Sequence, residues 1–177
     1  MAAEFWEEVF PFQGDRENTL KKMQEDVYKN GRFFRLYKSF DDAVKKLGGR
    51  DYSDVPEELA EEIKSADAEK IEKYKSMGKA STIEEEINHI KILNEAEGTK
   101  SALDFTGFSE KAEFHKFRYF SGEKLEKLLG TDKPSIEQIR NSNLKIRALC
   151  GRSSGICLPV HENGTVKELY FCALSAN

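Results

Sequence analysis

All three cysteines of this sequence lie near its C-terminal end, at Cys150, Cys157 and Cys172. Thiols can ligate zinc, act as nucleophiles beside a base, or pair as a disulfide. Cys157 and His161 are four residues apart in a segment typical of a β-strand, which separates them by roughly 13 Å. That separation excludes a nucleophile–base pair and a shared zinc ion, so we predict no metal site. We expect plain reduced thiols, with one disulfide, such as Cys150–Cys157, as the alternative.

The segments around these cysteines are predicted to form a β-hairpin. Asn163-Gly164 separates residues 155–161 from residues 166–172, and this dipeptide favours a two-residue type I′ turn. The resulting register places Cys157 opposite Tyr170 and makes Cys157 and Cys172 diagonal neighbours. Alternation along each strand then predicts two faces. We expect a core face with Ile156, Leu158, Val160, Leu169 and Phe171, and an outer face with Cys157, His161, Glu168, Tyr170 and Cys172.

Residues 114–120, Phe-His-Lys-Phe-Arg-Tyr-Phe, form the densest aromatic and basic stretch of the chain. Phe114, Phe117 and Phe120 recur at three-residue steps, which predicts a helix that buries all three rings on one face. The alternative is a surface that binds single-stranded nucleic acid, because aromatic rings stack on bases while interleaved cations neutralise phosphates. That alternative requires the rings to be exposed.

The charges are unevenly distributed along the chain, although the net charge is only −4. Residues 54–97 hold 13 acidic and 6 basic side chains, whereas residues 111–152 hold 10 basic and 5 acidic ones. Such a split steers an oppositely charged partner toward one region. We therefore expect a small binding or regulatory protein without a catalytic site, whose partner is a protein or another polyanionic macromolecule. The candidate binding residues are Lys116, Arg118, Arg140, Lys145, Arg147, Arg152 and Tyr170.

The residues named above must be positioned by helices and strands, which the spacing of apolar residues predicts. Phe5 to Phe10 and residues 15–28 show helical periodicity, and Ser109 is a candidate cap for a helix through the aromatic and basic stretch. Residues 32–37 and 102–108 are the expected early and middle strands. Helices with few strands and a late hairpin predict an α+β fold, mostly helical with a small antiparallel sheet that includes the C-terminal β-hairpin.

We expect residues 1–177 to form a single domain, or that domain with an N-terminal helical arm over residues 1–30. No apolar run approaches the roughly 18 residues that span a bilayer, and the acidic N-terminus lacks the features of a signal peptide. These observations predict a soluble, cytoplasmic protein without a membrane partner. The Asn163-Gly164-Thr165 sequon leaves a secreted mature form as the alternative.

The C-terminal part of the chain resembles secreted acid ribonucleases. The resemblance rests on residues 139–141 (Ile-Arg-Asn), 155–157 (Gly-Ile-Cys) and 166–172 (Val-Lys-Glu-Leu-Tyr-Phe-Cys). Those enzymes use histidines in two upstream segments, and neither segment is present here. The resemblance implies a ribonuclease-like effector as an alternative function, but it assigns no catalytic residues.

Two other segments resemble ADP-ribosyltransferase toxins. Phe34-Arg35-Leu36-Tyr37 is similar to their first strand, in which an arginine contacts NAD, and residues 101–106 are similar to their middle segment. This resemblance implies NAD as a cofactor, Arg35 as its contact, Thr106 in the middle segment and Glu168 as the catalytic acid. Outside this alternative the sequence predicts no cofactor.

Overall fold

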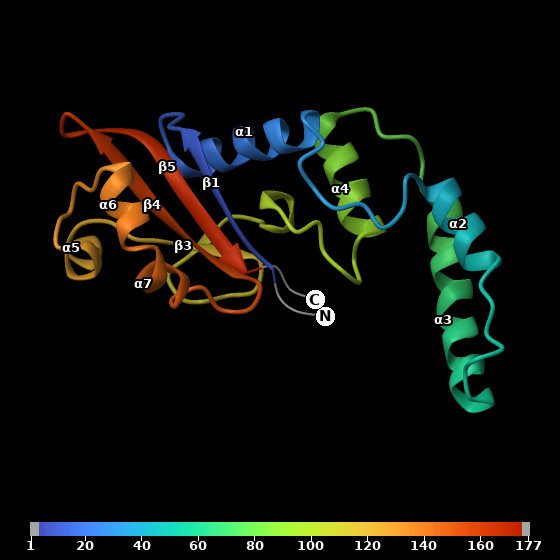
Figure 1. The fold of residues 1–177 in the computed structure, drawn as a ribbon. Helices are drawn as coiled ribbons and strands as arrows, with labels where there is room; N and C mark the ends of the chain where they lie inside the picture. Colours follow the sequence, from blue (N-terminus) through green and yellow to red (C-terminus); the bar gives the residue numbers. More distant parts are fainter. Residues whose placement is uncertain (1–3, 175–177) are drawn as a thin grey trace. The chain divides into compact units, whose positions relative to one another are not determined.

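The computed structural model describes residues 4–174, which divide into two compact units (Figure 1). The first unit combines residues 4–34 with residues 96–174, and the second unit comprises residues 35–95. The expectation of a single domain over the whole chain stays a prediction.

The second unit is helical and contains most of the acidic stretch. It consists of α2 (Phe40–Gly48), α3 (Glu57–Ser76) and α4 (Ile83–Leu93). Its core is a cluster of buried side chains, Ala43, Leu47, Tyr74 and Leu93. The side chain of Ser39 accepts a hydrogen bond from the amide of Asp42 and thereby caps α2. The prediction of a strand over residues 32–37 is wrong, because no strand forms there.

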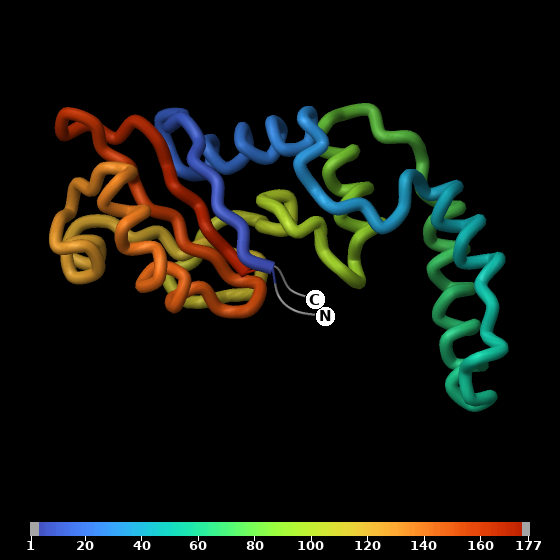
Figure 2. Tube along the Cα trace, viewed as in Figure 1, coloured from blue at the N-terminus to red at the C-terminus, as the bar shows by residue number. Residues whose placement is uncertain are grey.

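The first unit is built on a five-stranded mixed sheet in the order β1-β5-β4-β3-β2. Its strands are β1 (Phe5–Pro11), β2 (Phe108–Ser109), β3 (Lys116–Tyr119), β4 (Ser154–Glu162) and β5 (Thr165–Leu174). The pairs β1–β5 and β5–β4 are antiparallel, whereas β4–β3 and β3–β2 are parallel. The α+β class is therefore confirmed, but the expected small antiparallel sheet is wrong. The tube view shows β1 and β5, from the two ends of the chain, running side by side (Figure 2).

Helices cover this sheet. They are α1 (Arg16–Lys29), the 3-10 helix η1 (Ala102–Asp104), α5 (Glu123–Leu129), α6 (Ile136–Asn141) and α7 (Asn143–Arg147). Asp15 caps α1 by accepting from the amide of Asn18, and Gly130 ends α5 in the left-handed conformation at φ 77°. No helix within residues 4–174 is both long enough and apolar enough to cross a membrane.

Two helical expectations are wrong in this unit. Phe5 to Phe10 form β1 rather than the start of a helical arm, and the segment after Ser109 leads into β3 rather than a helix. In both cases the spacing of apolar residues suggested a helix. The backbone instead pairs with a distant strand, since β1 pairs with β5 and β3 pairs with β4. The middle strand expected over residues 102–108 is also mostly absent, because η1 occupies its beginning.

The C-terminal hairpin forms, but only the part of its register near the turn agrees with expectation. Asn163 and Gly164 both have positive φ, as a type I′ turn requires, and Glu162 pairs with Thr165. A bulge next to His161 then shifts the strands by one residue, so that Cys157 lies opposite Phe171 rather than Tyr170. A one-residue shift moves every later side chain of β5 to the other face.

The shifted register gives the sheet two faces of different composition. The first, here called the aliphatic face, packs against α5, α6 and α7 and contains Ile156, Leu158, Val160, Tyr170 and Cys172. The second, here called the aromatic face, contains Trp6, Phe117 and Phe171 and receives Phe105 from the end of η1. The expectation that Leu169 and Phe171 share a face with Ile156 is therefore wrong.

Candidate functional site

Four of the candidate binding residues lie on one exposed stretch of the first unit. Arg140 is in α6, Lys145 and Arg147 are in α7, and Arg152 precedes β4. No Asp or Glu occurs between residues 138 and 161. Among residues 4–174, no carboxylate lies within ion-pairing distance of Arg140, Lys145 or Arg147. Arg140, Lys145 and Arg147 therefore present positive charge to solvent without an ion-pair partner among the described residues.

The local sequence explains how this stretch is built. Ser135 and Gln138 form a capping box at the start of α6, in which each side chain accepts from the other residue's amide. Ile139 and Ile146 are fully buried in the core of the aliphatic face and hold α6 and α7 against the sheet. Of the residues between them, Arg140, Asn141, Leu144 and Lys145 are exposed, whereas Ser142 and Asn143 are half-buried.

Leu144 is the most exposed large apolar side chain on this stretch, with 84% of its surface accessible. A single exposed leucine is common on protein surfaces. Leu144, however, is flanked in the sequence by Arg140, four residues before it in α6, and by Arg147, three residues after it in α7, and all three are exposed. We call the set Arg140, Leu144, Lys145 and Arg147 the basic ridge.

Arg147 of the basic ridge and the neighbouring Arg118 also stabilise the fold. The guanidinium of Arg147 lies 3.9 Å from the ring centroid of Phe5, a cation–π contact that joins α7 to β1. Arg118 of β3 is half-buried, donates to the carbonyl of Leu149 and lies over the ring of Phe120 at 5.6 Å. Arg118 is thus a structural link between β3 and the end of α7, and is less available to a partner than the ridge.

Two further candidate binding residues lie elsewhere. Tyr170 is 2% exposed and donates its hydroxyl hydrogen to Glu7 Oε2 at 2.8 Å. Burial, followed by the negative charges that Cys172 and Glu7 can carry, raises the pKa of Tyr170 well above its ordinary value. Lys116 is half-buried where β3 begins, opposite Ser154. The structure therefore places Tyr170 in the core rather than on a binding surface.

The aromatic and basic stretch 114–120 does not present three rings to solvent. Phe117 is fully buried and stacks on Phe105 with ring centroids 4.0 Å apart, and Phe120 is half-buried. Phe114 is 65% exposed. A platform that stacks successive bases needs several exposed rings, so the structure offers little support for the alternative of single-stranded nucleic-acid binding.

The three residues implied by the ADP-ribosyltransferase resemblance lie in different parts of the structure. Arg35 is an exposed residue of the second unit, whereas Thr106 and Glu168 belong to the first. Thr106 donates its hydroxyl hydrogen to the carbonyl of His115, directly before β3. Glu168 pairs with Val160 near the far end of β4, about 20 Å along the strands from the β3 end. The structure does not bring Thr106 and Glu168 together.

Glu168 instead borders a cavity of about 560 Å³ that was not expected from the sequence. Its lining also includes His161, Glu137, Glu162 and Lys167. The Nδ1 atom of His161 is buried and has no hydrogen-bond partner among the described residues. Burial, and then the charge of Lys133, lower the pKa of His161, so the imidazole is neutral at pH 7.

The side chains that line this cavity limit the chemistry it can support. Within residues 4–174, no group of three or more His, Cys, Asp or Glu side chains is arranged to hold a metal ion. None of the residues that line the cavity is a cysteine. A neutral imidazole can accept a proton, and Ser135 and Lys167 also line the cavity. The hydroxyl oxygen of Ser135 accepts the Gln138 amide hydrogen bond that caps α6. Val160 and His161, which flank the bulge, both line this cavity, and the sequence analysis did not predict that bulge.

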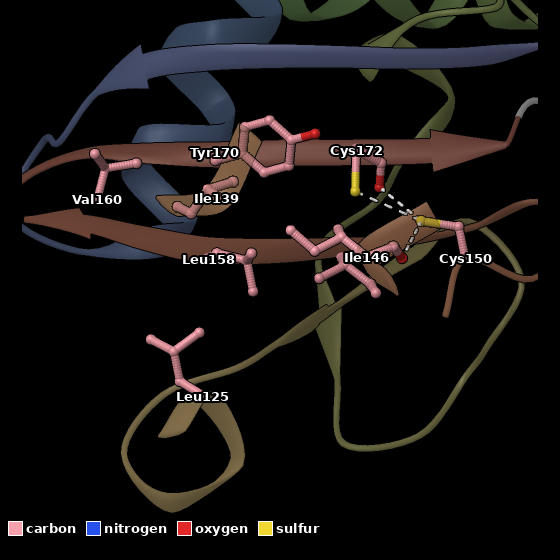
Figure 3. Close-up of a cluster of buried hydrophobic side chains, with 9 residues drawn as sticks. Leu125, Ile139, Ile146, Cys150, Leu158, Val160, Tyr170 and Cys172 are labelled. Atoms are coloured by element: carbon pink, nitrogen blue, oxygen red, sulfur yellow. Dashed lines mark hydrogen bonds between the residues drawn. The ribbon is translucent and has the colours of Figure 1, made fainter. Parts of the chain in front are cut away.

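The structure also brings two cysteines together (Figure 3). Cys150, which follows α7, and Cys172 of β5 are both buried, and their Sγ atoms are 3.5 Å apart. Cys157 lies on the aromatic face, where burial raises the pKa of its thiol well above the ordinary value. The expected diagonal pairing of Cys157 and Cys172 is wrong, because the register shift places them on opposite faces.

Comparison with known proteins adds no functional information. No protein-family model matches the chain, and neither a curated protein nor a solved structure shows significant similarity to it. The function must therefore be argued from the chemistry of the described side chains.

Proposed function

We propose that this protein binds an acidic protein partner through the basic ridge and has no catalytic role there. The observation that carries the proposal is the exposure of Leu144, 84%, between cations without ion-pair partners. An apolar side chain flanked by cations suits a polypeptide segment that offers an apolar residue among carboxylates. A nucleic-acid backbone would engage the cations and would leave Leu144 without a contact.

The charge balance around the basic ridge supports an electrostatic contribution to binding. The acid-free sequence from residue 138 to 161 carries four cations, of which Arg140 and Lys145 make no hydrogen bond or ring contact within the described chain. Their positive charge is thus uncompensated nearby and attracts an acidic surface before contact. Such attraction weakens as salt increases, because the Debye length falls from about 10 Å at 0.1 M to about 3 Å at 1 M.

Fluorescence anisotropy with two labelled synthetic peptides tests the proposal. Both peptides are rich in Asp and Glu, and only one carries leucines at helical spacing. We expect the leucine-containing peptide to bind more tightly, with an affinity that falls as salt is added. The double variant Arg140→Glu/Lys145→Glu should lose about tenfold in affinity or more, which corresponds to about 1.4 kcal/mol. Leu144→Ser should lose roughly fivefold, and only for the leucine-containing peptide.

The matched control is Lys29→Glu/Lys111→Glu, which changes the net charge equally at two exposed positions outside the basic ridge. This control should bind as the unchanged protein does. Equal losses in both double variants would mean that net charge alone governs binding, and the basic ridge would not be the site. Tighter binding of a single-stranded RNA of equal charge than of either peptide would contradict a protein partner.

A further inference from the structure

We propose that Cys150 and Cys172 form a reversible disulfide by exchange with a small disulfide oxidant such as oxidised glutathione, while Cys157 stays reduced. This inference does not depend on the proposed function of the basic ridge. The geometry carries it: the two Sγ atoms are 3.5 Å apart, and the third sulfur lies on the other face of the sheet. A disulfide needs the sulfurs to approach to about 2.05 Å.

The setting of Cys150 favours it as the thiol that reacts first. Its pKa is lowered by the hydrogen bond between the two thiols, in which either sulfur can be the donor, and by the nearby charges of Arg118 and Arg147, although burial opposes this shift. That same hydrogen bond and burial raise the pKa of Cys172 well above its ordinary value. Cys150 is therefore the more readily formed thiolate, and Cys172 is the thiol that completes the bond.

Access to Cys150 depends on the turn that follows it. Cys150 is only 7% exposed, whereas Gly151 and Arg152 are exposed. Ser153 adopts φ 56°, in the left-handed region that few non-glycine residues occupy, and its hydroxyl is buried without a partner among the described residues. Backbone hydrogen bonds from Ser153 to Leu174 and from Ser154 to Gly151 hold the turn. Local opening that breaks them would admit an oxidant to Cys150 but not to Cys157, which is fully buried in β4.

The chemistry proceeds in two exchange steps. The Cys150 thiolate attacks one sulfur of oxidised glutathione, the glutathione S–S bond breaks, and one glutathione leaves as a thiolate that takes up the proton Cys150 released. Cys172 then attacks the Cys150 sulfur of this mixed disulfide, and its proton goes to the second departing glutathione. Two protein thiols are thereby oxidised to one disulfide, and one oxidised glutathione is reduced to two thiols.

The disulfide would fasten the end of α7 to β5. Cys150 is three residues beyond Arg147, the last residue of α7, and Cys172 is in the strand between β1 and β4. Cross-linking these positions restricts the unfolded chain and stabilises the folded one. We expect the oxidised protein to melt about 5 °C higher than the reduced protein.

Redox titration of the full chain, followed by mass spectrometry, tests the inference. The native protein is equilibrated in glutathione buffers from reducing to oxidising, quenched with acid, unfolded and alkylated with N-ethylmaleimide. Trypsin, which cuts after Lys and Arg, then separates the three cysteines into peptides 148–152, 153–167 and 168–177. We expect a disulfide between peptides 148–152 and 168–177 in oxidising buffer, and full alkylation of peptide 153–167.

The variants Cys150→Ser, Cys172→Ser and Cys157→Ser sharpen the result. The first two should lose both the cross-link and the rise in melting temperature, whereas Cys157→Ser, the matched control, should keep both. A cross-link that includes peptide 153–167 would overturn the inference. So would stable glutathione adducts without a cross-link, or three fully alkylated cysteines in the most oxidising buffer. The unsubstituted protein decides these outcomes, whether or not every variant folds.

Discussion

The two faces of the sheet in the first unit come from the same strands but differ in what they bury. The aromatic face stacks rings from separate segments, with Phe117 in contact with Phe105, Trp6 and Phe171. The aliphatic face combines branched side chains with polar groups, including Tyr170 and the Cys150–Cys172 pair. Tyr170 and the Cys150–Cys172 pair therefore lie beneath α6 and α7, under the basic ridge, whereas the aromatic face consists of packed rings.

The largest expected difference between the faces concerns their central residues. Phe117→Ala should lower the free energy of unfolding by about 3–5 kcal/mol, because it removes a fully buried ring that contacts several others. Leu158→Ala, fully buried on the aliphatic face, should cost less, about 2–4 kcal/mol. Urea unfolding measures both changes. A greater loss in Leu158→Ala would show that the aliphatic face dominates the stability of the sheet.

The next largest loss of stability is expected at Gly155, whose backbone lies close to a neighbouring ring and a carbonyl oxygen. A Cβ atom there would lie 2.5 Å from the ring of Phe117 and 2.9 Å from the carbonyl oxygen of Cys172. Gly155→Ala should therefore destabilise the protein by about 1–3 kcal/mol in the same assay. Gly78→Ala, where a Cβ atom would meet nothing within 4 Å, is the control and should change stability little. Equal stabilities of the two variants would mean that Phe117 has room to move.

Alkaline unfolding compares one tyrosine from each face, the buried Tyr170 and the half-buried Tyr119. The raised pKa of Tyr170 means that the folded protein keeps the phenol neutral, whereas the unfolded chain ionises it above about pH 10. The stability linked to this group is therefore complete below about pH 10 and is lost as the pH rises further. Tyr119, half-buried on the aromatic side, also has its pKa raised by burial, but the nearby charge of Arg16 opposes that shift.

Tyr170→Phe should consequently lessen the alkaline loss of stability more than Tyr119→Phe does, as urea unfolding at a series of pH values would show. At neutral pH, Tyr170→Phe should cost about 1 kcal/mol, since it removes the hydrogen bond to Glu7. An alkaline slope that is the same in Tyr170→Phe as in the unchanged protein would contradict this account of Tyr170.

The smallest expected effect on stability comes from a cation–π contact at the edge of the aliphatic face. Arg147 and Phe5 should show a coupling energy of about 0.5–1 kcal/mol in a double-mutant cycle with Arg147→Ala and Phe5→Ala. Unfolding of the two single variants and the double variant measures it. If the losses of stability in the two single variants add up to the loss in the double variant, the cation–π contact contributes nothing to stability. Arg147 would then be as available to a partner as Lys145.

Local signals in the sequence predicted local structure well. The cap at Ser39, the stop of α1 at Asn30-Gly31 and the Asn163-Gly164 turn are all present. Each of these depends on the dihedral angles or side-chain hydrogen bonds of a few adjacent residues. The α+β class followed from such signals, and so did the basic residues of the ridge, because charge and composition are properties of the sequence itself.

Only the tertiary structure decided which apolar segments became strands and which side chains meet. Phe5 to Phe10 form a strand because β5 pairs with them, and β5 lies at the other end of the chain. The bulge beside His161 sets the face of every later residue of β5 and so places Cys172 beside Cys150. Hydrogen bonds between distant strands outweigh local periodicity because they satisfy the backbone of both segments. The sequence determined which reactive groups exist, and the sheet determined which of them are neighbours.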